Sequence, residues 1–368
     1  MCAGQNDEME RIMKKWEANV RRVDPYVPGE QPKCGKLIKL NTNENPYPPS
    51  PKVKQVLRGM DGDLLRRYPD PTADALVSAI AANYGLKKEE VFVGVGSDDV
   101  LAMLFMTFFN GKKKILFPDI TYSFYPVWAN MLRIPYEMKP LDEDFNIRKE
   151  DYYEENGGIV FPNPNAPTGK ELPLSEIEDI IVHNPDVIVI VDEAYVDFGA
   201  VSSLSLIHKY DNVIVVQTFS KSRSLAGMRI GYAMANEKLI SYLNDVKYAF
   251  NSYTMNQTSI LAGVAAMEDK AYFEKTCAKI VATREHAKEV LAQMGFTFAD
   301  AKGNFLFVTR EHTDCEALYE ALREHHIYVR HFNEPQRIKN YLRITIGTDE
   351  EMEALFAFLR EWLDKCCK

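Results

Sequence analysis

VIVVQTFSKSRSLAGMRIG, residues 213–231, begins as an apolar run of β type and then places a lysine, Lys221, between two serines. An arginine, Arg229, follows eight positions later. This arrangement suits a lysine whose amine is used in chemistry while the nearby arginine holds an anion. A lysine beside serines is usually a solvated surface residue, so this stretch alone does not settle its role. The surrounding sequence has to show whether the lysine follows a buried strand.

Apolar runs and helix-like periodicity alternate from Thr72 to about residue 265. Such alternation favours a mostly parallel sheet that is covered by helices on both faces. Beyond that point a long helical stretch, 270–294, leads into short strands and two more helices, which is an α+β pattern. We therefore expect an α/β fold in which a large, doubly wound, mostly parallel sheet domain precedes a smaller α+β domain.

The chain has 368 residues, which is too long for one small core, and its expected division has three parts. Residues 1–45 form an N-terminal arm that packs with the small domain, 46–265 form the large domain, and 266–368 form the small domain. Within the arm, 7–22 is expected to be a short amphipathic helix. The segment LNTNENPYPPSP (40–51) is expected to be an ordered loop or extended arm, because Asn and Pro interrupt it.

Three apolar runs of the large domain finish in polar residues. They are GIVFPNPNAPTG (158–169), VIVIVDEAY (187–195) and VIVVQTFSK (213–221). Ligands of open α/β sheets bind at the carboxyl ends of parallel strands. If these strands are parallel, an amide, a carboxylate, a phenol and an amine meet at one crevice, namely those of Asn165, Asp192, Tyr195 and Lys221.

Pyridoxal 5′-phosphate requires such a set of groups. A carboxylate pairs with the ring nitrogen, a phenol and an amide bond the ring oxygen O3′, and a lysine forms an imine and moves the substrate's proton. Ser220 and Arg229 would hold the phosphate. Each group also has a purely structural interpretation, since Asp192 could cap a turn and Tyr195 could pack with a solvated hydroxyl. Their joint occurrence at three strand ends favours the cofactor site.

Two further segments give weaker indications of the same site. VFVGVGSDD (91–99) predicts a strand, a glycine turn and a helix start, whose backbone N–H groups can bind a phosphate near Ser97 and Asp98. The same two residues are also ordinary helix caps. Tyr122 follows another strand end, and it could stack on the cofactor ring or belong to the core.

The composition excludes several other functions. A net charge of −9 argues against nucleic acid or an anionic membrane as the main partner. The N-terminus, MCAGQNDEMERIMKKW, is no signal peptide, and no apolar run is long enough to span a bilayer. The six cysteines lack metal-ligand or disulfide spacing, which indicates reduced thiols and a cytoplasmic protein. No metal is expected, since His325, His326 and His331 fit no common zinc pattern.

Seven motifs stand in the order found in class I/II aminotransferases of fold type I, which this chain resembles over roughly residues 20–360. They are NENPYPPSP, RYPDP (67–71), VGVGSDD, FPNPNAPTG, VDEAYVDF, TFSKSRSLAGMRIGY and YLRITIGT. The NENP, RYP and LRITIGT elements are most similar to the histidinol-phosphate aminotransferase branch. The resemblance therefore implies pyridoxal 5′-phosphate as cofactor and a homodimer with shared active sites.

Carried over to this sequence, the resemblance implies roles for single residues. Lys221 is the Schiff-base lysine, Asp192 and Tyr195 are the partners of the ring nitrogen and O3′, and Tyr122 stacks on the ring. The phosphate would be held by Ser97, Asp98, Ser220 and Arg229.

The resemblance also implies residues that meet the substrate or the second subunit. Arg343 would clamp the acidic group of the substrate, and Arg330 would help to bind the phosphate of histidinol phosphate. Tyr26 in the arm would close over the substrate, and Tyr68 would reach the phosphate of the neighbouring subunit's cofactor. The alternation of Leu342, Ile344 and Ile346 independently puts Arg343 on the opposite face of a strand, toward a cleft or toward solvent.

One position departs from the family pattern. The family places the amide that bonds O3′ directly before the proline of Asn-Pro-Thr-Gly, whereas this chain has Ala166 there and Asn165 one residue earlier. Either Asn165 shifts to make this contact or O3′ relies more on Tyr195. We assign Asn165 to the cofactor.

The resulting prediction is an aminotransferase that moves the amino group of histidinol phosphate to 2-oxoglutarate in histidine biosynthesis. An aromatic amino-acid aminotransferase is one alternative. A lyase like the threonine-phosphate decarboxylases, which share the fold and several motifs, is another. A regulator that senses an amine would carry a DNA-binding domain ahead of the fold, and the short arm and acidic chain argue against it.

Overall fold

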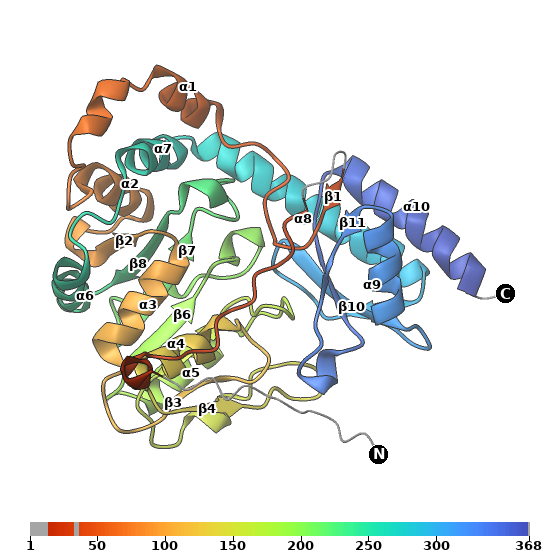
Figure 1. Ribbon diagram of the computed structural model, residues 1–368, viewed down its shortest axis with the longest axis horizontal. Coiled ribbons are helices and arrows are strands. Elements are labelled where there is room, and N and C mark those ends of the chain that lie inside the picture. Colours follow the sequence, from red (N-terminus) through yellow and green to blue (C-terminus); the bar gives the residue numbers. More distant parts are fainter. Residues whose placement is uncertain (1–13, 33–36, 367–368) are drawn as a thin grey trace, which may run out of the picture.

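A seven-stranded sheet forms the centre of the larger part of the molecule in the computed structural model, which describes residues 14–32 and 37–366 (Figure 1). The strands follow the order β2-β8-β7-β6-β5-β3-β4. Their bounds are β2 Val91–Gly94, β3 Ile115–Pro118, β4 Tyr136–Lys139, β5 Ile159–Pro162, β6 Val189–Asp192, β7 Val213–Thr218 and β8 Gly231–Ala235. β8 is the one strand of this sheet that runs opposite to the other six, so the prediction of a mostly parallel sheet is confirmed.

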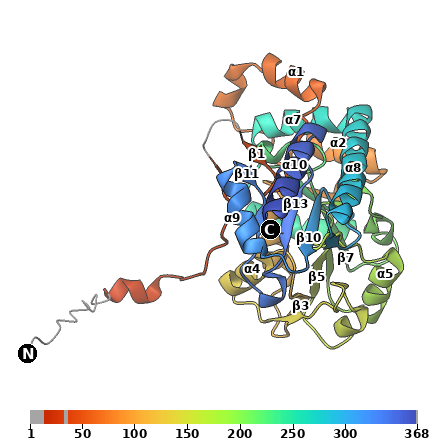
Figure 2. The same cartoon turned by 90° about the vertical axis from the view of Figure 1, so that its right-hand side faces the viewer.

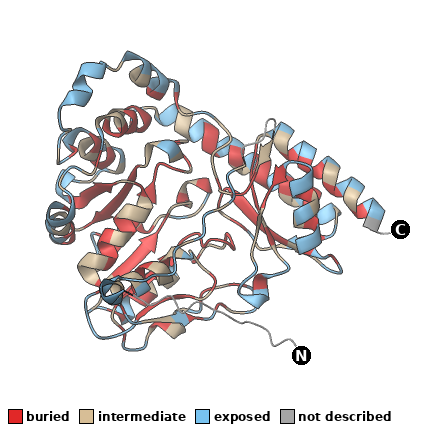
Figure 3. Ribbon diagram, in the orientation of Figure 1, coloured by how far each residue is buried: buried red, intermediate tan, exposed pale blue. Residues whose placement is uncertain are grey.

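Both faces of this sheet are covered because successive side chains of a strand point to opposite sides. Ile190 of β6 belongs to a cluster with α3, α4 and α6, whereas Val189 and Val191 belong to a cluster with α2, α5 and α7. The helices are α2 Asp74–Tyr84, α3 Ser97–Phe108, α4 Phe124–Leu132, α5 Leu174–His183, α6 Glu237–Phe250 and α7 Gln257–Met267. Figure 3 shows the strands as a buried layer between these helices.

A four-stranded antiparallel sheet with the order β12-β13-β10-β9 forms a second, smaller core. Its strands are β9 Phe296–Phe298, β10 Phe305–Arg310, β12 Arg330–His331 and β13 Leu342–Thr345. It packs with α8 Lys270–Gln293, α9 Cys315–Glu324 and α10 Asp349–Cys366. The long helix α8 runs from the larger part into the smaller one (Figure 1).

The N-terminal arm joins the smaller core through a short parallel pair. β1 (Ile38–Lys39) pairs with β11 (Ile327–Tyr328), and Leu40 is buried in the second core. These contacts support the division that we propose: an arm over 1–45, a large domain over 46–265 and a small domain over 266–368.

One local expectation for the arm needs correction. The helix expected over 7–22 lies partly outside the described residues, and its described part has only a 3-10 turn, Lys15–Asn19, followed by extended backbone at Val20. In Figure 2 this turn stands away from the rest of the chain. The loop over 40–51 leads directly into a helix that we did not predict, α1 Pro51–Gly59, which the Ser50 side chain caps by accepting from the Lys52 N–H.

Two further observations concern membrane spans and cysteines. None of the helices in the described ranges is both long and apolar enough to cross a membrane. Cys277 and Cys315 are buried free thiols. Cys2, Cys34 and Cys367 lie outside the described residues.

Candidate active site

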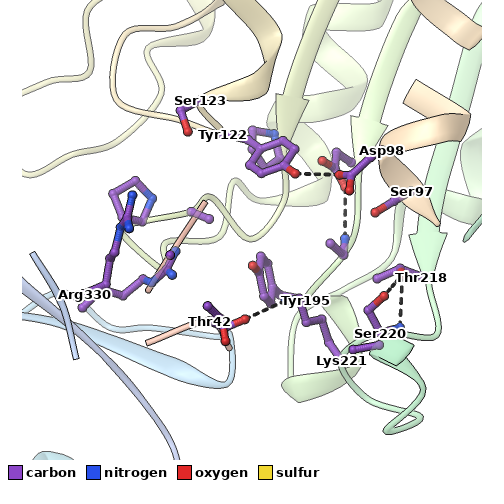
Figure 4. Close-up of a pocket in the computed structure, with 18 of the residues that line it drawn as sticks. Thr42, Ser97, Asp98, Tyr122, Ser123, Tyr195, Thr218, Ser220, Lys221 and Arg330 are labelled. Carbon is purple, nitrogen blue, oxygen red and sulfur yellow. Dashed lines mark hydrogen bonds between the residues drawn. The ribbon is translucent and has the colours of Figure 1, made fainter. Parts of the chain in front are cut away.

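A cavity of about 280 Å³ lies where the carboxyl ends of β5, β6 and β7 face the small sheet (Figure 4). It is lined by every site residue predicted from the sequence except Asn165 and Tyr68. The residues brought together are Tyr26, Ser97, Asp98, Tyr122, Asp192, Tyr195, Ser220, Lys221, Arg229, Arg330 and Arg343. Because β5, β6 and β7 are parallel, their polar ends do meet at one edge.

Lys221 is the third residue after the end of β7. Its Nζ donates a hydrogen bond to the Thr42 carbonyl at 3.0 Å and lies 5.7 Å from the centre of the Tyr195 ring. Its own carbonyl accepts a hydrogen bond from Asn45 Nδ2 at 3.0 Å. The arm therefore holds both the backbone and the amine of Lys221 at the cavity wall.

Asp192 is the last residue of β6 and is only 4% exposed. The Tyr125 hydroxyl donates to one carboxylate oxygen at 3.0 Å, and the Ala194 N–H donates to the other at 3.3 Å. Burial raises the pKa of Asp192 to about 7. No cation of the described residues forms an ion pair with this carboxylate, so a cationic N–H group in the cavity would suit it.

The N-terminus of α3 forms one corner of the cavity. Gly96 precedes the helix with a φ of 88°, and a Cβ there would lie 2.4 Å from Arg229 Nη2. Arg229 Nη2 donates to the carboxylate of Asp98 at 3.1 Å. Glycine thus permits the close approach of the guanidinium to the helix start, where Ser97 and free backbone N–H groups favour an anion.

Three hydroxyl groups complete this corner. The Tyr122 hydroxyl donates to Asp98 at 2.6 Å, and burial together with that carboxylate raises the pKa of Tyr122. Thr218 Oγ1 donates to Ser220 Oγ at 3.0 Å and accepts from the Ser220 N–H at 3.1 Å. Hydroxyls, helix N–H groups and a guanidinium are donors that suit a phosphate.

Two arginines of the small sheet face the same cavity. Arg330 on β12 and Arg343 on β13 are directly opposite each other in the register of these antiparallel strands. Arg343 Nη2 donates to the Asn41 carbonyl at 3.0 Å, whereas its Nε is buried without a hydrogen-bond partner in the described residues. Burial lowers the pKa of Arg343. Like charges in opposite positions repel each other, so this pair favours an anionic ligand.

Tyr26 reaches the cavity from the arm. Its ring stacks on Phe124, the first residue of α4, with ring centres 4.2 Å apart and planes inclined by 20°. Phe332 lies on the same side of the cavity, 5.7 Å from the Arg330 guanidinium. Aromatic surface therefore borders the two arginines.

Asn165 does not line the cavity, contrary to our expectation. Its Nδ2 donates to the Ile120 carbonyl at 2.9 Å and to Thr168 Oγ1 at 3.0 Å. Its Oδ1 accepts from the Thr121 hydroxyl at 3.2 Å. Both ends of the amide therefore already have partners in the Ile120–Thr121 segment and in the loop itself, whereas the neighbouring Ala166 lines the cavity.

Tyr68 also lies away from the cavity of its own chain. Its side chain is 81% exposed and stacks on Tyr253 with ring centres 4.6 Å apart. The expected role in a second subunit is thus compatible with its position on the surface.

The sequence analysis missed several residues that line the cavity. They include Thr42 and Glu44 of the arm, Thr121 and Thr218 of the large domain, and Phe332 of the small domain. Hydrogen bonds from Lys39 and Thr42 hold the pKa of Glu44 below its ordinary value, although burial alone would raise it. The run of polar residues NTNEN between Leu40 and Pro46 was the available signal, because such a run in an ordered arm needs partners.

Comparisons with known proteins agree with this geometry. A family model described as aminotransferase class I and II matches residues 35–359. A histidinol-phosphate aminotransferase of Acinetobacter baylyi is 52% identical over 355 residues, which are 96% of this chain and 98% of that protein. The chain belongs to the class I and II aminotransferases.

Solved structures of this aminotransferase fold superpose over most of the chain. A histidinol-phosphate aminotransferase from Sinorhizobium meliloti in complex with pyridoxal-5′-phosphate has a TM-score of 0.80 at 23% identity and covers 89% of this chain and 92% of its own. An L-threonine-O-3-phosphate decarboxylase from Porphyromonas gingivalis has a TM-score of 0.75 at 19% identity and covers 89% and 100%. At such identities the likeness shows the fold alone, which aminotransferases and decarboxylases share.

Membership of the family confirms the predicted enzyme class and its cofactor, pyridoxal 5′-phosphate. The donor set of the cavity fits that molecule. Asp192 is a buried carboxylate without a cationic partner, the corner at α3 is rich in donors for a phosphate, and Lys221 supplies an amine between them. In the described ranges, no group of three or more His, Cys, Asp or Glu residues could hold a metal ion.

Proposed function

We propose that this aminotransferase moves the amino group of histidinol phosphate to 2-oxoglutarate, a step of histidine biosynthesis. The opposition of Arg330 and Arg343 at the cavity carries the proposal. Neither guanidinium forms an ion pair with a carboxylate of the described residues, so both are available to a substrate. The 52% identity to a histidinol-phosphate aminotransferase supports the same substrate.

The chemistry of these two substrates matches the arginines. A phosphate dianion on one substrate and the carboxylates of the other both need strong cationic donors, and guanidinium groups bind each of these anions bidentately. The imidazole ring of histidinol phosphate is flat and partly apolar. Tyr26, Tyr122 and Phe332 border the cavity with rings that suit it.

The residues at the strand ends then act on the cofactor. Bound pyridoxal 5′-phosphate supplies an electron sink that acidifies the hydrogen next to the substrate nitrogen. Lys221 Nζ would anchor the cofactor and move that proton, Asp192 would keep a proton on the ring nitrogen, and Tyr195 would donate to the ring oxygen. Tyr122 would stack on the ring. Ser97, Ser220, Arg229 and the start of α3 would hold the phosphate, and Asp98 accepts a hydrogen bond that orients Arg229.

We also propose a homodimer in which Tyr68 reaches the site of the second copy. Tyr68 stacks on Tyr253, which is 45% exposed. Leu65 and Phe250, each three positions before one of these two tyrosines in the chain, are 59% and 68% exposed. Exposed aromatic and aliphatic side chains of this kind are typical of an interface between subunits. Asn165 is not part of this proposal, since it does not line the cavity and its amide already has hydrogen-bond partners.

A half-reaction screen tests the substrate. The purified holoenzyme is mixed with histidinol phosphate, phenylalanine, tyrosine or threonine phosphate, and the loss of the visible absorbance of the bound cofactor is followed. We expect histidinol phosphate to react at least about 100-fold more efficiently than phenylalanine, because one charge-assisted contact is worth about 2 to 3 kcal/mol. A faster reaction with phenylalanine or tyrosine would contradict the substrate. Release of carbon dioxide from threonine phosphate would contradict the reaction type.

A further inference from the structure

Asn43 is fully buried in the arm and connects three parts of the molecule. Its backbone N–H donates to Thr345 Oγ1 at 3.0 Å, and its Oδ1 accepts from the same hydroxyl at 3.0 Å. Its carbonyl accepts from Asn304 Nδ2 at 3.0 Å, and its Nδ2 donates to the hydroxyl of Tyr195 at 3.0 Å. Every polar group of Asn43 is therefore engaged.

These contacts determine which way the amide faces. The Thr345 hydroxyl has one proton and gives it to Asn43 Oδ1, while it accepts from the Asn43 N–H. Since Oδ1 is used by Thr345, the amide nitrogen is the group that meets Tyr195. The left-handed backbone of Asn43, with a φ of 56°, places the side chain for both contacts, and asparagine tolerates this conformation well.

The consequence for Tyr195 follows from the chemistry of a phenol. Its oxygen accepts the hydrogen bond from Asn43, so its single proton stays available for a different acceptor. Tyr195 lines the cavity beside Lys221. No second donor comes from the loop at Ala166, because Ala166 has no polar side chain and the amide of Asn165 is used elsewhere.

We propose that Asn43 is a positioning residue that fixes the Tyr195 hydroxyl as a donor to the ring oxygen of the cofactor. Through Thr345 it also ties this donor to β13, the strand that carries Arg343. The inference rests on the proposed role of Tyr195, which is the donor that Asn43 orients.

The test is a pH titration of the visible absorbance of the holoenzyme. The negative charge on the ring oxygen helps to keep a proton on the neighbouring Lys221 nitrogen, and a hydrogen bond to that oxygen weakens this effect. Loss of the hydrogen bond therefore raises the pH at the midpoint of the absorbance change. In Asn43→Gly the left-handed backbone is kept and the amide is removed. We expect its midpoint to rise by about one pH unit, which is the change that corresponds to one hydrogen bond. In a Tyr195→Phe background the same change should add nothing.

Asn304→Ala is the matched control, because it removes a hydrogen bond to the Asn43 backbone and leaves the Tyr195 contact intact. We expect it to lower the melting temperature without moving the midpoint. If Asn43→Gly moved the midpoint no more than Asn304→Ala, the inference would be wrong. If Asn43→Gly fails to fold, Thr345→Val is the second variant, because it frees the Asn43 amide to turn. We expect it to raise the midpoint as well. An unchanged midpoint in Thr345→Val would also refute the inference. A Tyr195→Phe variant with an unchanged midpoint would instead refute the proposed role of Tyr195.

Discussion

One wall of the cavity, which we call the sheet wall, comes from the ends of β6 and β7 and holds Asp192, Tyr195, Ser220 and Lys221. The other wall, which we call the arm wall, consists of Asn41, Thr42 and Glu44 with Arg330 and Arg343. Neighbouring parallel strands build the sheet wall, whereas the arm wall joins segments such as Asn43 and Thr345 that are 302 positions apart.

The two walls differ in the role that we expect each to have in the reaction. The strands β6 and β7 that carry the sheet wall are buried in the large core, and the Tyr195 ring packs against the small core. Groups on such buried elements are held in place and suit the fixed shape of the cofactor. The arm wall carries guanidinium groups that have no acidic partner in the described residues. We therefore expect changes in the sheet wall to abolish chemistry with every substrate, and changes in the arm wall to alter the choice of substrate.

Lys221→Ala should have the largest effect. Removal of the amine eliminates both the anchor of the cofactor and the group that moves the proton, so we expect turnover to fall at least about 1000-fold with every substrate. Turnover with histidinol phosphate and the visible absorbance of the purified protein are the measurements. Lys209→Ala, at an exposed lysine paired with Glu178, is the control. Full turnover in Lys221→Ala would show that the sheet wall does not carry out the reaction.

Asp192→Asn should lower turnover about 100-fold, because the proton on the ring nitrogen loses its charged partner. The same variant has a consequence for the cofactor-free protein. The folded pKa of Asp192 is about 7 and lies above the ordinary value of 3.8, so the folded state binds the proton more tightly than the unfolded state. Ionisation of Asp192 therefore destabilises the parent protein increasingly as the pH rises from about 4 to 7.

The asparagine variant lacks this penalty. Its advantage in the free energy of unfolding should be absent near pH 4 and grow to at most about 4 kcal/mol at pH 7, since a tenfold difference in proton affinity between the folded and unfolded states corresponds to about 1.4 kcal/mol. Denaturant unfolding of the two cofactor-free proteins across this range measures it. Glu193, whose pKa burial also raises to about 7, is common to both proteins and cancels in the difference. If the difference in the free energy of unfolding did not change with pH, the pKa of Asp192 would not be raised in the folded protein.

Arg343→Gln should reduce kcat/KM about 100-fold for histidinol phosphate and for glutamate, because both offer an anion to this residue. Arg330→Gln should cost about tenfold and chiefly affect the phosphate substrate. In both variants the visible absorbance without substrate should match the parent. Arg310→Gln, at the far end of β10 in the same sheet, serves as the control. If the two arginine variants lost as much kcat/KM with an uncharged amine, the arm wall would not act through the charge of the substrate, and the proposed division of roles between the two walls would be wrong.

Tyr68→Phe should have the smallest effect. The loss of one hydrogen bond to the phosphate weakens cofactor binding about fivefold, as one such bond contributes about 1 kcal/mol. Equilibrium dialysis of pyridoxal 5′-phosphate measures the change, and sedimentation shows whether two copies associate. A monomer with normal cofactor affinity would refute the shared site.

The sequence predicted the sheet wall well because its signal is local. Each strand is an apolar run that ends in a polar residue, and parallel pairing then brings the ends of β6 and β7 together. Asn165 does not line the cavity because the direction of a side chain in the loop after β5 depends on the partners Ile120 and Thr121 from another segment, and its contact with the cofactor stays a prediction. The same reason hid Asn43, whose role depends on contacts with distant residues that no local pattern records.

The hydrogen bonds of Asn41 and Asn43 to β13 also affect the order in which the protein can be completed. The arm is synthesised before its partners Arg343 and Thr345, from which Asn41 and Asn43 are each separated by 302 positions. Closing contacts over such a separation is slow, whereas Asn45 can already pair with the Lys221 and Ser222 carbonyls of the large domain. The sheet wall can therefore form before the arm has met β13, and the arm wall is completed only once β13 has been made.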